Sequence, residues 1–179
     1  MVPFPTSVAT GNVIVAGVVI VGGTVTSVSD SKGSTFTQAV SAGSVYVYVA
    51  TLSSSGSDTV TVTFSHGWPV EEVVYIYEVS GVTTTEAGTG TGGGDGTSMS
   101  TSAVAFLSGA FLLGIIQDGS QPVTAGAGFT LSPDPSETSL SHAQYSTSGV
   151  SSPTTFPATV AIEATWVEVG VALNPAPAP

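Results

Sequence analysis

The alternation of valine with threonine or tyrosine restricts the fold of this chain more than any other feature. In residues 58–64, valine and phenylalanine alternate with threonine, and in residues 44–50 valine alternates with tyrosine. Successive side chains of a strand point to opposite faces, so a period of two predicts strands rather than helices. Lys, Arg and Glu, which favour helices, are scarce. We therefore expect an all-β protein with almost no helix.

Other segments are predicted to be strands by their apolar content: 12–21, 24–29, 34–39, 72–80, 109–117 and 159–173. The run 12–21 is either a central strand buried on both faces or a strand paired against another subunit. Turn residues at 30–33 and 53–57 predict two hairpins, one joining 24–29 to 34–39 and one joining 44–50 to 58–64. In 159–173 the apolar face changes after Trp166, which predicts a β-bulge near that residue.

The length of 179 residues suits a single domain. We predict one antiparallel β-sandwich over residues 12–173, of the Ig-like or jelly-roll kind. An extended N-terminal arm of residues 1–11 precedes it, and a Pro-Ala tail of residues 174–179 follows it. The glycine-rich segment 81–98 is predicted to be a loop or an inter-subunit contact, because glycine is costly to order.

Charge excludes several classes of partner. Lys32 is the only Lys or Arg against twelve acids, which gives a formal net charge of −11 with histidine neutral. Binding to nucleic acid or to an anionic membrane surface is therefore opposed electrostatically. The apolar runs are shorter than the ~20 residues of a membrane helix, so no membrane insertion is expected. A surface of Ser, Thr and Gly repels neighbouring copies less than a surface rich in charged residues, and so favours close self-packing.

Several segments together resemble a β-sandwich domain found in many uncharacterised surface proteins of bacteria, archaea and phages. They are residues 11–15, 24–37, 58–64, 77–81 and 126–130, which span most of the chain. This resemblance implies an Ig-like or jelly-roll sandwich and supplies no catalytic residues. The acid-rich, Lys-poor composition is also similar to that of archaeal extracellular pilus and tubule subunits, which join by donor strands.

The second likeness implies a structural subunit of an extracellular filament, pilus or tubule on the cell surface, assembled from copies of itself by donor-strand complementation or edge pairing. The N-terminal segment is the favoured donor, with subunit-interface candidates Val2, Phe4, Val8, Val13 and Val15. The alternative, that this segment is the first strand of its own sandwich, has equal weight. The alternative functions are a monomeric adhesion or carbohydrate-binding module and a phage structural protein.

Motifs for chemistry are weak. Gly88, Gly90 and Gly93 fit G-x-G-x-x-G but lack a βαβ context. His66 and His142 are candidate bases for a Ser-His-Asp triad, yet no G-x-S-x-G accompanies them. We therefore expect a non-enzymatic protein without catalytic residues or a cofactor.

Two binding hypotheses remain open. Ca²⁺ could be held by loop oxygens of Asp30, Asp95, Asp118 or Asp134, although solvated turn acids explain these residues more simply. Aromatic residues could form a sugar-stacking platform, although packing between sheets explains them more simply; they are Tyr46, Tyr48, Tyr75, Tyr77, Trp68 and Trp166.

Overall fold

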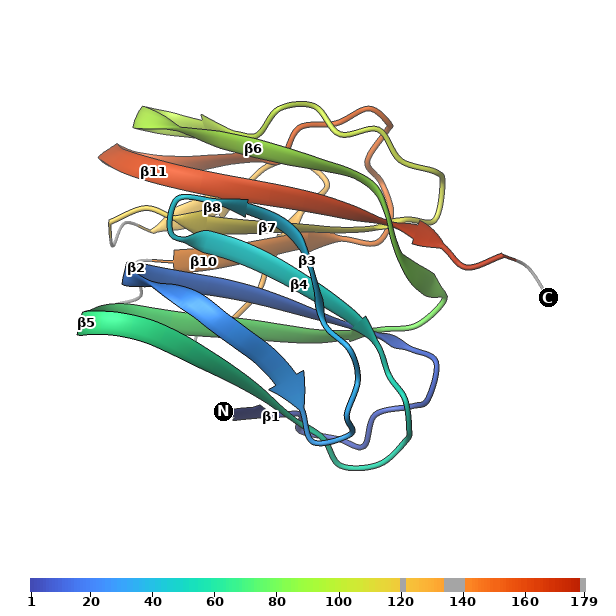
Figure 1. Ribbon diagram of the computed structural model, residues 1–179. Helices are drawn as coiled ribbons and strands as arrows, with labels where there is room; N and C mark the ends of the chain where they lie inside the picture. The colour runs from blue at the N-terminus through green and yellow to red at the C-terminus, as the bar shows by residue number, and fades with distance from the viewer. Residues whose placement is uncertain (120–121, 134–140, 178–179) are drawn as a thin grey trace.

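The computed structural model describes residues 1–119, 122–133 and 141–177, without the side chains of residues 66–70 (Figure 1). Strands run through these residues and no helix is present among them, so the all-β prediction is confirmed. The strands are β1 (Val2–Pro3), β2 (Val13–Asp30), β3 (Thr37–Ala42), β4 (Val45–Thr51), β5 (Thr59–Val79), β6 (Val82–Ser100), β7 (Phe111–Gln117), β8 (Val123–Ala125), β9 (Thr130–Leu131), β10 (Ser141–Ser146) and β11 (Pro157–Pro175).

Two antiparallel sheets face each other, which confirms the predicted sandwich. The first sheet has the order β1-β5-β2-β4-β3. The second has the order β6-β11-β7-β10-β9, and β8 pairs with β11 beside it. The two sheets lie as two layers, with β2 and β5 in one and β7, β10 and β11 in the other (Figure 1).

The main core fills the space between the sheets. Its buried side chains come from alternate positions of the facing strands, as period-two patterning requires. They include Val15, Val47, Tyr75, Ile115 and Val171. Strand β2 pairs with β4 on one side and β5 on the other, and residues 13–20 are buried on both faces. The prediction of a central strand at 12–21 is therefore confirmed.

The outer face of each sheet is also covered, because one long strand pair of that sheet bends and returns over it. Beyond the register shift at Val21/Gly23, the β2–β5 ribbon reverses and passes beneath the first sheet (Figure 1). This places a second apolar cluster there, with Val8, Ile14, Leu52 and Val60 buried. The β6–β11 ribbon does the same over the second sheet after the shift between Thr159 and Ala164. Its cluster contains Met99, Ile116, Val123, Ala158, Val160 and Trp166.

Both predicted hairpins are wrong, because the long strands pair with each other instead. Residues 24–30 pair with β5, not with residues 34–39, and β4 pairs with β2 and β3 rather than with 58–64. The turn at 30–33 nevertheless forms. Asp30 Oδ1 accepts the N–H groups of Lys32 and Ser34 at 3.1 and 2.8 Å, and Gly33 has φ of 75°. The residues at 30–33 therefore predict the turn correctly, whereas tertiary packing decides which strands pair.

The predicted loop at 81–98 is also wrong, since residues 82–98 lie in strand β6. Its glycines allow the following segment, residues 100–105, to approach closely. A Cβ on Gly90 would lie 2.6 Å from the carbonyl oxygen of Ser102, and one on Gly92 would lie 2.2 Å from that of Ser100. Glycine is used here for close backbone packing rather than for flexibility.

The pairing of β11 with β6 shifts register between Thr159 and Ala164, two residues before Trp166, and again at Ala172/Leu173 and Leu173/Pro175, whereas residues 164–172 pair without interruption. The change of apolar face arises because β11 is buried on both faces. Val160 and Trp166 enter the outer cluster, whereas Val169 and Val171 face the main core. Within the regular stretch 164–172, alternate positions face the two clusters, which explains the change of apolar face after Trp166 without a bulge at that residue.

The first and last described segments are hydrogen-bonded to the body of the molecule. Phe4 N–H donates to the Asp58 carbonyl at 3.0 Å, and Val8 forms a bridge with Gly56 and is 2% exposed. At the other end, Ala176 N–H donates to the Gly81 carbonyl at 2.8 Å. Prolines alternate with the bonded residues in both segments.

Candidate functional site

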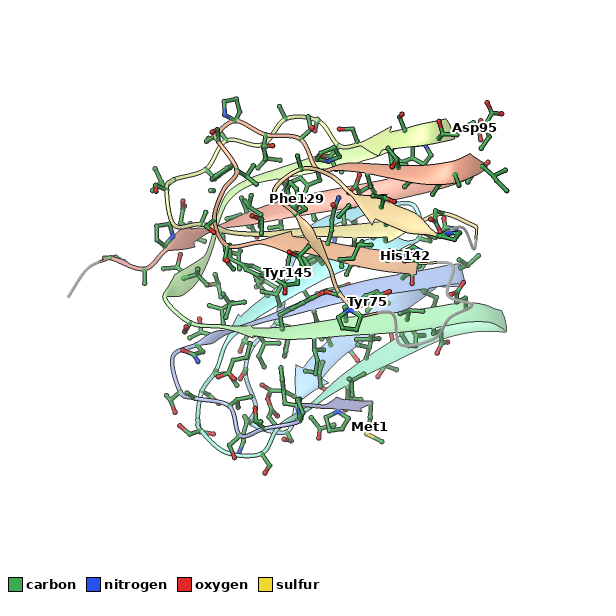
Figure 2. All side chains as sticks on the ribbon, turned by 180° about the vertical axis from the view of Figure 1, so that it is seen from behind. Met1, Tyr75, Asp95, Phe129, His142 and Tyr145 are labelled. Atoms are coloured by element: carbon green, nitrogen blue, oxygen red, sulfur yellow. The ribbon has the colours of Figure 1, made fainter. Side chains whose placement is uncertain are left out.

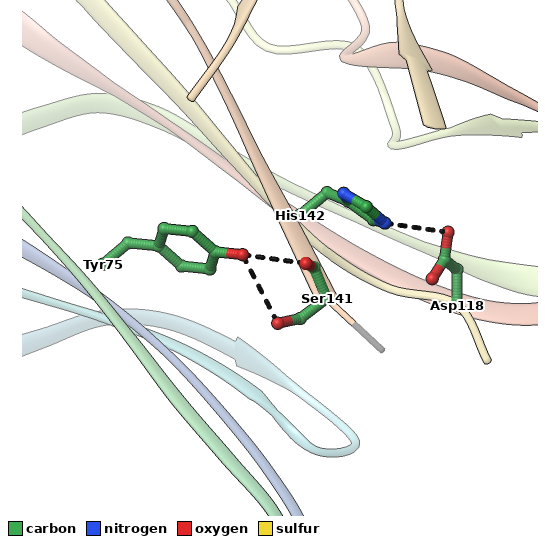
Figure 3. Close-up of polar contacts among 4 residues, drawn as sticks. All are labelled: Tyr75, Asp118, Ser141 and His142. Atoms are coloured by element: carbon green, nitrogen blue, oxygen red, sulfur yellow. Dashed lines mark hydrogen bonds and ion pairs between the residues drawn. The ribbon is translucent and has the colours of Figure 1, made fainter. Parts of the chain in front are cut away.

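A polar cluster joins the two sheets where β10 begins (Figure 3). Tyr75 Oη, from β5 in the first sheet, donates to the Ser141 carbonyl at 2.8 Å and lies 3.5 Å from Ser141 Oγ. His142 Nε2 lies 3.7 Å from Asp118 Oδ2. The Asp118 carboxyl is fully buried and the His142 side chain is 14% exposed. These four residues bring a phenol, a hydroxyl, an imidazole and a carboxylate into one region.

The geometry does not form a Ser-His-Asp triad from these residues. Ser141 and His142 are neighbours on β10, so their side chains point to opposite faces of the sheet. The Ser141 hydroxyl faces Tyr75 between the sheets, whereas His142 faces Asp118 on the outer side (Figure 3). The Asp118 carboxyl faces Nε2 of the imidazole at 3.7 Å, which is beyond hydrogen-bond distance, and Ser141 cannot be the nucleophile of that base. The side chain of His66 lies outside the described residues.

A second polar pair lies further along the same outer face. Gln144 Nε2 donates to Glu168 Oε1 at 2.9 Å, and both side chains are fully buried. They meet across Gly114, where a Cβ would stand 3.1 Å from both side chains. Glu168 Oε2 and Gln144 Oε1 make no hydrogen bond in the described part of the chain.

Burial governs the protonation of Glu168. Desolvation penalises its charged form and raises the pKa of Glu168 to about 8, against a smaller lowering by the hydrogen bond from Gln144. Glu168 therefore carries a proton at neutral pH in the folded protein. A protonated carboxyl is a hydrogen-bond donor, so this pair works as a neutral structural contact.

An aromatic groove opens on the side where β5 faces β9 and β10. Tyr77, Phe111 and Tyr145 contact one another with ring centroids 6.0–6.4 Å apart. They line a hollow of about 490 Å³. Tyr77 Oη is hydrogen-bonded to Ser132 Oγ, and burial raises the pKa of Tyr77 to about 12. Figure 2 shows Tyr145 and Tyr75 on this side of the molecule.

The Ca²⁺ candidates do not come together. Asp30 caps the turn after β2, Asp95 accepts a hydrogen bond from Thr165 Oγ1 at 2.5 Å in β6, and Asp118 is buried beside His142. Asp134 lies outside the described residues. Within the described residues no group of three or more His, Cys, Asp or Glu side chains could hold a metal ion.

The predicted subunit-interface residues are divided between two places. Val13 and Val15 are in β2 and fully inside the main core. Val8 is buried in the cluster beneath the first sheet, and Val2 and Phe4 are half-buried in the N-terminal arm. A role for this set between copies stays a prediction, because in this chain all five pack on their own sandwich.

The predicted aromatic platform is dispersed. Tyr46 and Tyr48 stack at 6.5 Å on the outer side of β4, whereas Tyr75 and Tyr77 point between the sheets. Trp166 is buried in the outer cluster of the second sheet, and the Trp68 side chain lies outside the described residues. The described tyrosines and Trp166 thus do not present one continuous stacking surface.

Sequence reasoning missed Glu168, Gln144 and the aromatic groove. A signal for Glu168 existed, since it is the one acid in the apolar run 166–173. Gln144, in contrast, stands in a polar stretch that gives no hint of burial. Comparison of the chain with protein-family models, with curated proteins and with solved structures gave no match.

Proposed function

We propose that this protein is a structural subunit that assembles with copies of itself into an extracellular filament, pilus or tubule, by edge pairing or strand exchange. The observation that carries the proposal is the open edge of β3. This strand pairs with β4, and on its other side the described residues place no strand. A strand edge without a partner in its own sheet can add a strand from another copy.

The β3 edge lacks most features that prevent pairing between molecules. Proteins protect edge strands with charged residues, prolines or bulges. Residues 37–42 contain no charged residue and no proline, and a bulge lies between Gln38 and Val40. The arm is different, because Pro3 and Pro5 alternate with Phe4, whose N–H is already bonded inward. Edge pairing is therefore favoured at β3 over the arm.

Strand exchange through the arm is a second route. The arm is joined to its own sandwich by few backbone bonds, and Gly11, with φ of 84°, stands between it and β2. An arm released at Gly11 could place Val2, Phe4 and Val8 in the same contacts on another copy. Val13 and Val15 belong to the core and would stay behind.

Assembly is tested by light scattering after size exclusion and by negative-stain electron microscopy of the purified chain. We expect polymers of the wild type, and their loss in Ser41→Glu, which adds a carboxylate to the exposed β3 edge. Ser29→Glu is the matched control, since it adds the same charge to an exposed residue of β2 in the same sheet. A wild type that stays monomeric at every protein and salt concentration would refute the proposed function.

A further inference from the structure

A hollow lies on the outer side of the second sheet, where β7 begins and β10 ends. Its volume is about 540 Å³, within the ~300–1,000 Å³ range of small-molecule sites. Its wall is formed by two stretches of the chain, residues 106, 108–110 and 112 in the first and residues 146–152 in the second. All of them are described residues.

The floor of the hollow is apolar. Ala110 and Leu112 are 5% and 2% exposed, and belong to the cluster around Phe156. Phe106 and Val150 are half-buried and pack against the same cluster. The hollow is therefore a shallow opening onto packed side chains, with the Phe106 ring on its wall.

The rim carries hydroxyl groups. Ser108, Thr147, Ser148 and Ser151 are exposed, and within the described residues their side chains make no hydrogen bond to the protein. Other groups hold the rim in place. Ser146 Oγ donates to the Ser148 carbonyl at 2.9 Å, and Phe106 N–H donates to Ser152 Oγ at 2.9 Å. The free hydroxyls thus stand on turns that are already fixed.

The chemistry of the wall selects the ligand. Every lining residue is uncharged, so a charged ligand could not form an ion pair with the wall of the hollow. Hydroxyls both donate and accept hydrogen bonds, which matches a ligand that is itself rich in hydroxyls. The apolar floor matches a ligand with a C–H face. A neutral sugar ring has both properties.

We propose that this hollow binds a neutral pyranose ring of a carbohydrate. The ring lies with one C–H face on the floor beside Phe106, and its hydroxyls bond to those of the rim. The aromatic groove at Tyr77 differs, because its rings pack on one another in the main core. This site does not depend on the proposed assembly, and a monomeric chain would carry it equally.

The test is NMR titration of the full chain with methyl glycosides of glucose, galactose, mannose and N-acetylglucosamine. At roughly 20 mM sugar, above the ~1 mM dissociation constant of a weak site, we expect saturable shifts confined to residues 106–112 and 146–152. Glycerol, which has hydroxyls but no ring, should not reproduce them. Absence of shifts with all four sugars, or equal shifts with glycerol, would overturn the proposal.

Variants locate the site. Ser108→Trp fills the hollow from an exposed position and should abolish the shifts, and the pair Ser148→Ala with Ser151→Ala should weaken binding at least tenfold. Ser54→Trp, at an exposed loop position in the first half of the chain, is the control and should bind as the wild type does. Unaltered binding in Ser108→Trp would place the sugar elsewhere and refute this site.

Discussion

Glu168 is a fully buried carboxyl with one bonded oxygen and no nearby base among the described contacts. Gln144 is bonded to it, and the backbone of Gly114 lies beside both side chains. The Phe156 ring packs against Gly114 and Gly170. Because this site cannot stabilise a negative charge, the protonated form is preferred and the pKa rises to about 8. The consequence is a pH dependence of folding that most acidic residues do not produce.

We predict that Glu168 lowers stability as pH rises. Below the usual pKa of 4.5, Glu168 is protonated in both the folded and the unfolded chain, so its contribution is largest. Between pH 4.5 and about 8 only the unfolded chain ionises, which costs roughly 5 kcal/mol in total at about 1.4 kcal/mol per pH unit. Above the folded-state pKa the loss is complete.

Glu168→Gln keeps the shape and removes the titration. The difference in urea unfolding free energy between Glu168→Gln and the wild type should therefore be small at pH 4 and grow in favour of the variant up to pH 8. Glu163→Gln, at an exposed position of the same strand, is the control and should show no such growth. A constant difference between Glu168→Gln and wild type across this range would contradict the assignment.

At the scale of elements, the strands with local signals were predictable and their partners were not. The buried run of β2 and the apolar β7 were read from composition, because a strand buried on both faces needs little but apolar residues. The predicted hairpins do not form because β2 and β5 pair along nearly their whole lengths, and β3 and β4 form a hairpin that joins the sheet where β4 pairs with β2. Strand β6 was predicted as a loop because glycine usually weakens a strand. The exception, another backbone segment packed against the glycines, is not visible in the sequence.

The glycines of β6 offer a matched test of that explanation. An alanine Cβ at Gly92 would lie 2.2 Å from the Ser100 carbonyl, whereas one at Gly94 would meet nothing nearer than the Trp166 ring at 3.9 Å. Gly92→Ala should therefore destabilise the fold by about 1–3 kcal/mol, and Gly94→Ala should stay within about 0.5 kcal/mol of the wild type. Equal urea midpoints for the two variants would show that close packing does not explain the glycines.

At the scale of the whole molecule, each sheet is covered on both faces, by the other sheet and by its own returning ribbon. This arrangement explains how a chain with so few charged residues can bury so many valines. It also explains why the pairing of the buried polar residues was not predicted. Asp118 meets His142, and Gln144 meets Glu168, only because β7, β10 and β11 are neighbours in one register. Sequence alone supplies the residues but not that register.

Net charge sets the conditions under which copies of this chain can approach. The formal charge is −11, and the amine of Lys32, the single base, makes no ion pair within the described residues. Carboxylates on two approaching copies repel each other over about 10 Å at 0.1 M salt and about 3 Å at 1 M. Edge pairing at the uncharged β3 adds no attraction between charges to offset this.

We therefore predict that assembly increases with ionic strength, from little at 10 mM to extensive at about 1 M NaCl, as measured by light scattering and sedimentation. Lys32→Gln and Lys32→Glu make the net charge progressively more negative, and should shift the salt needed for assembly upward in that order. CaCl₂ at equal ionic strength should act mainly by screening, since Asp30, Asp95 and Asp118 lie apart. Polymers that dissolve on adding NaCl would mean that ion pairs join the copies, and that the uncharged β3 edge is not the joint.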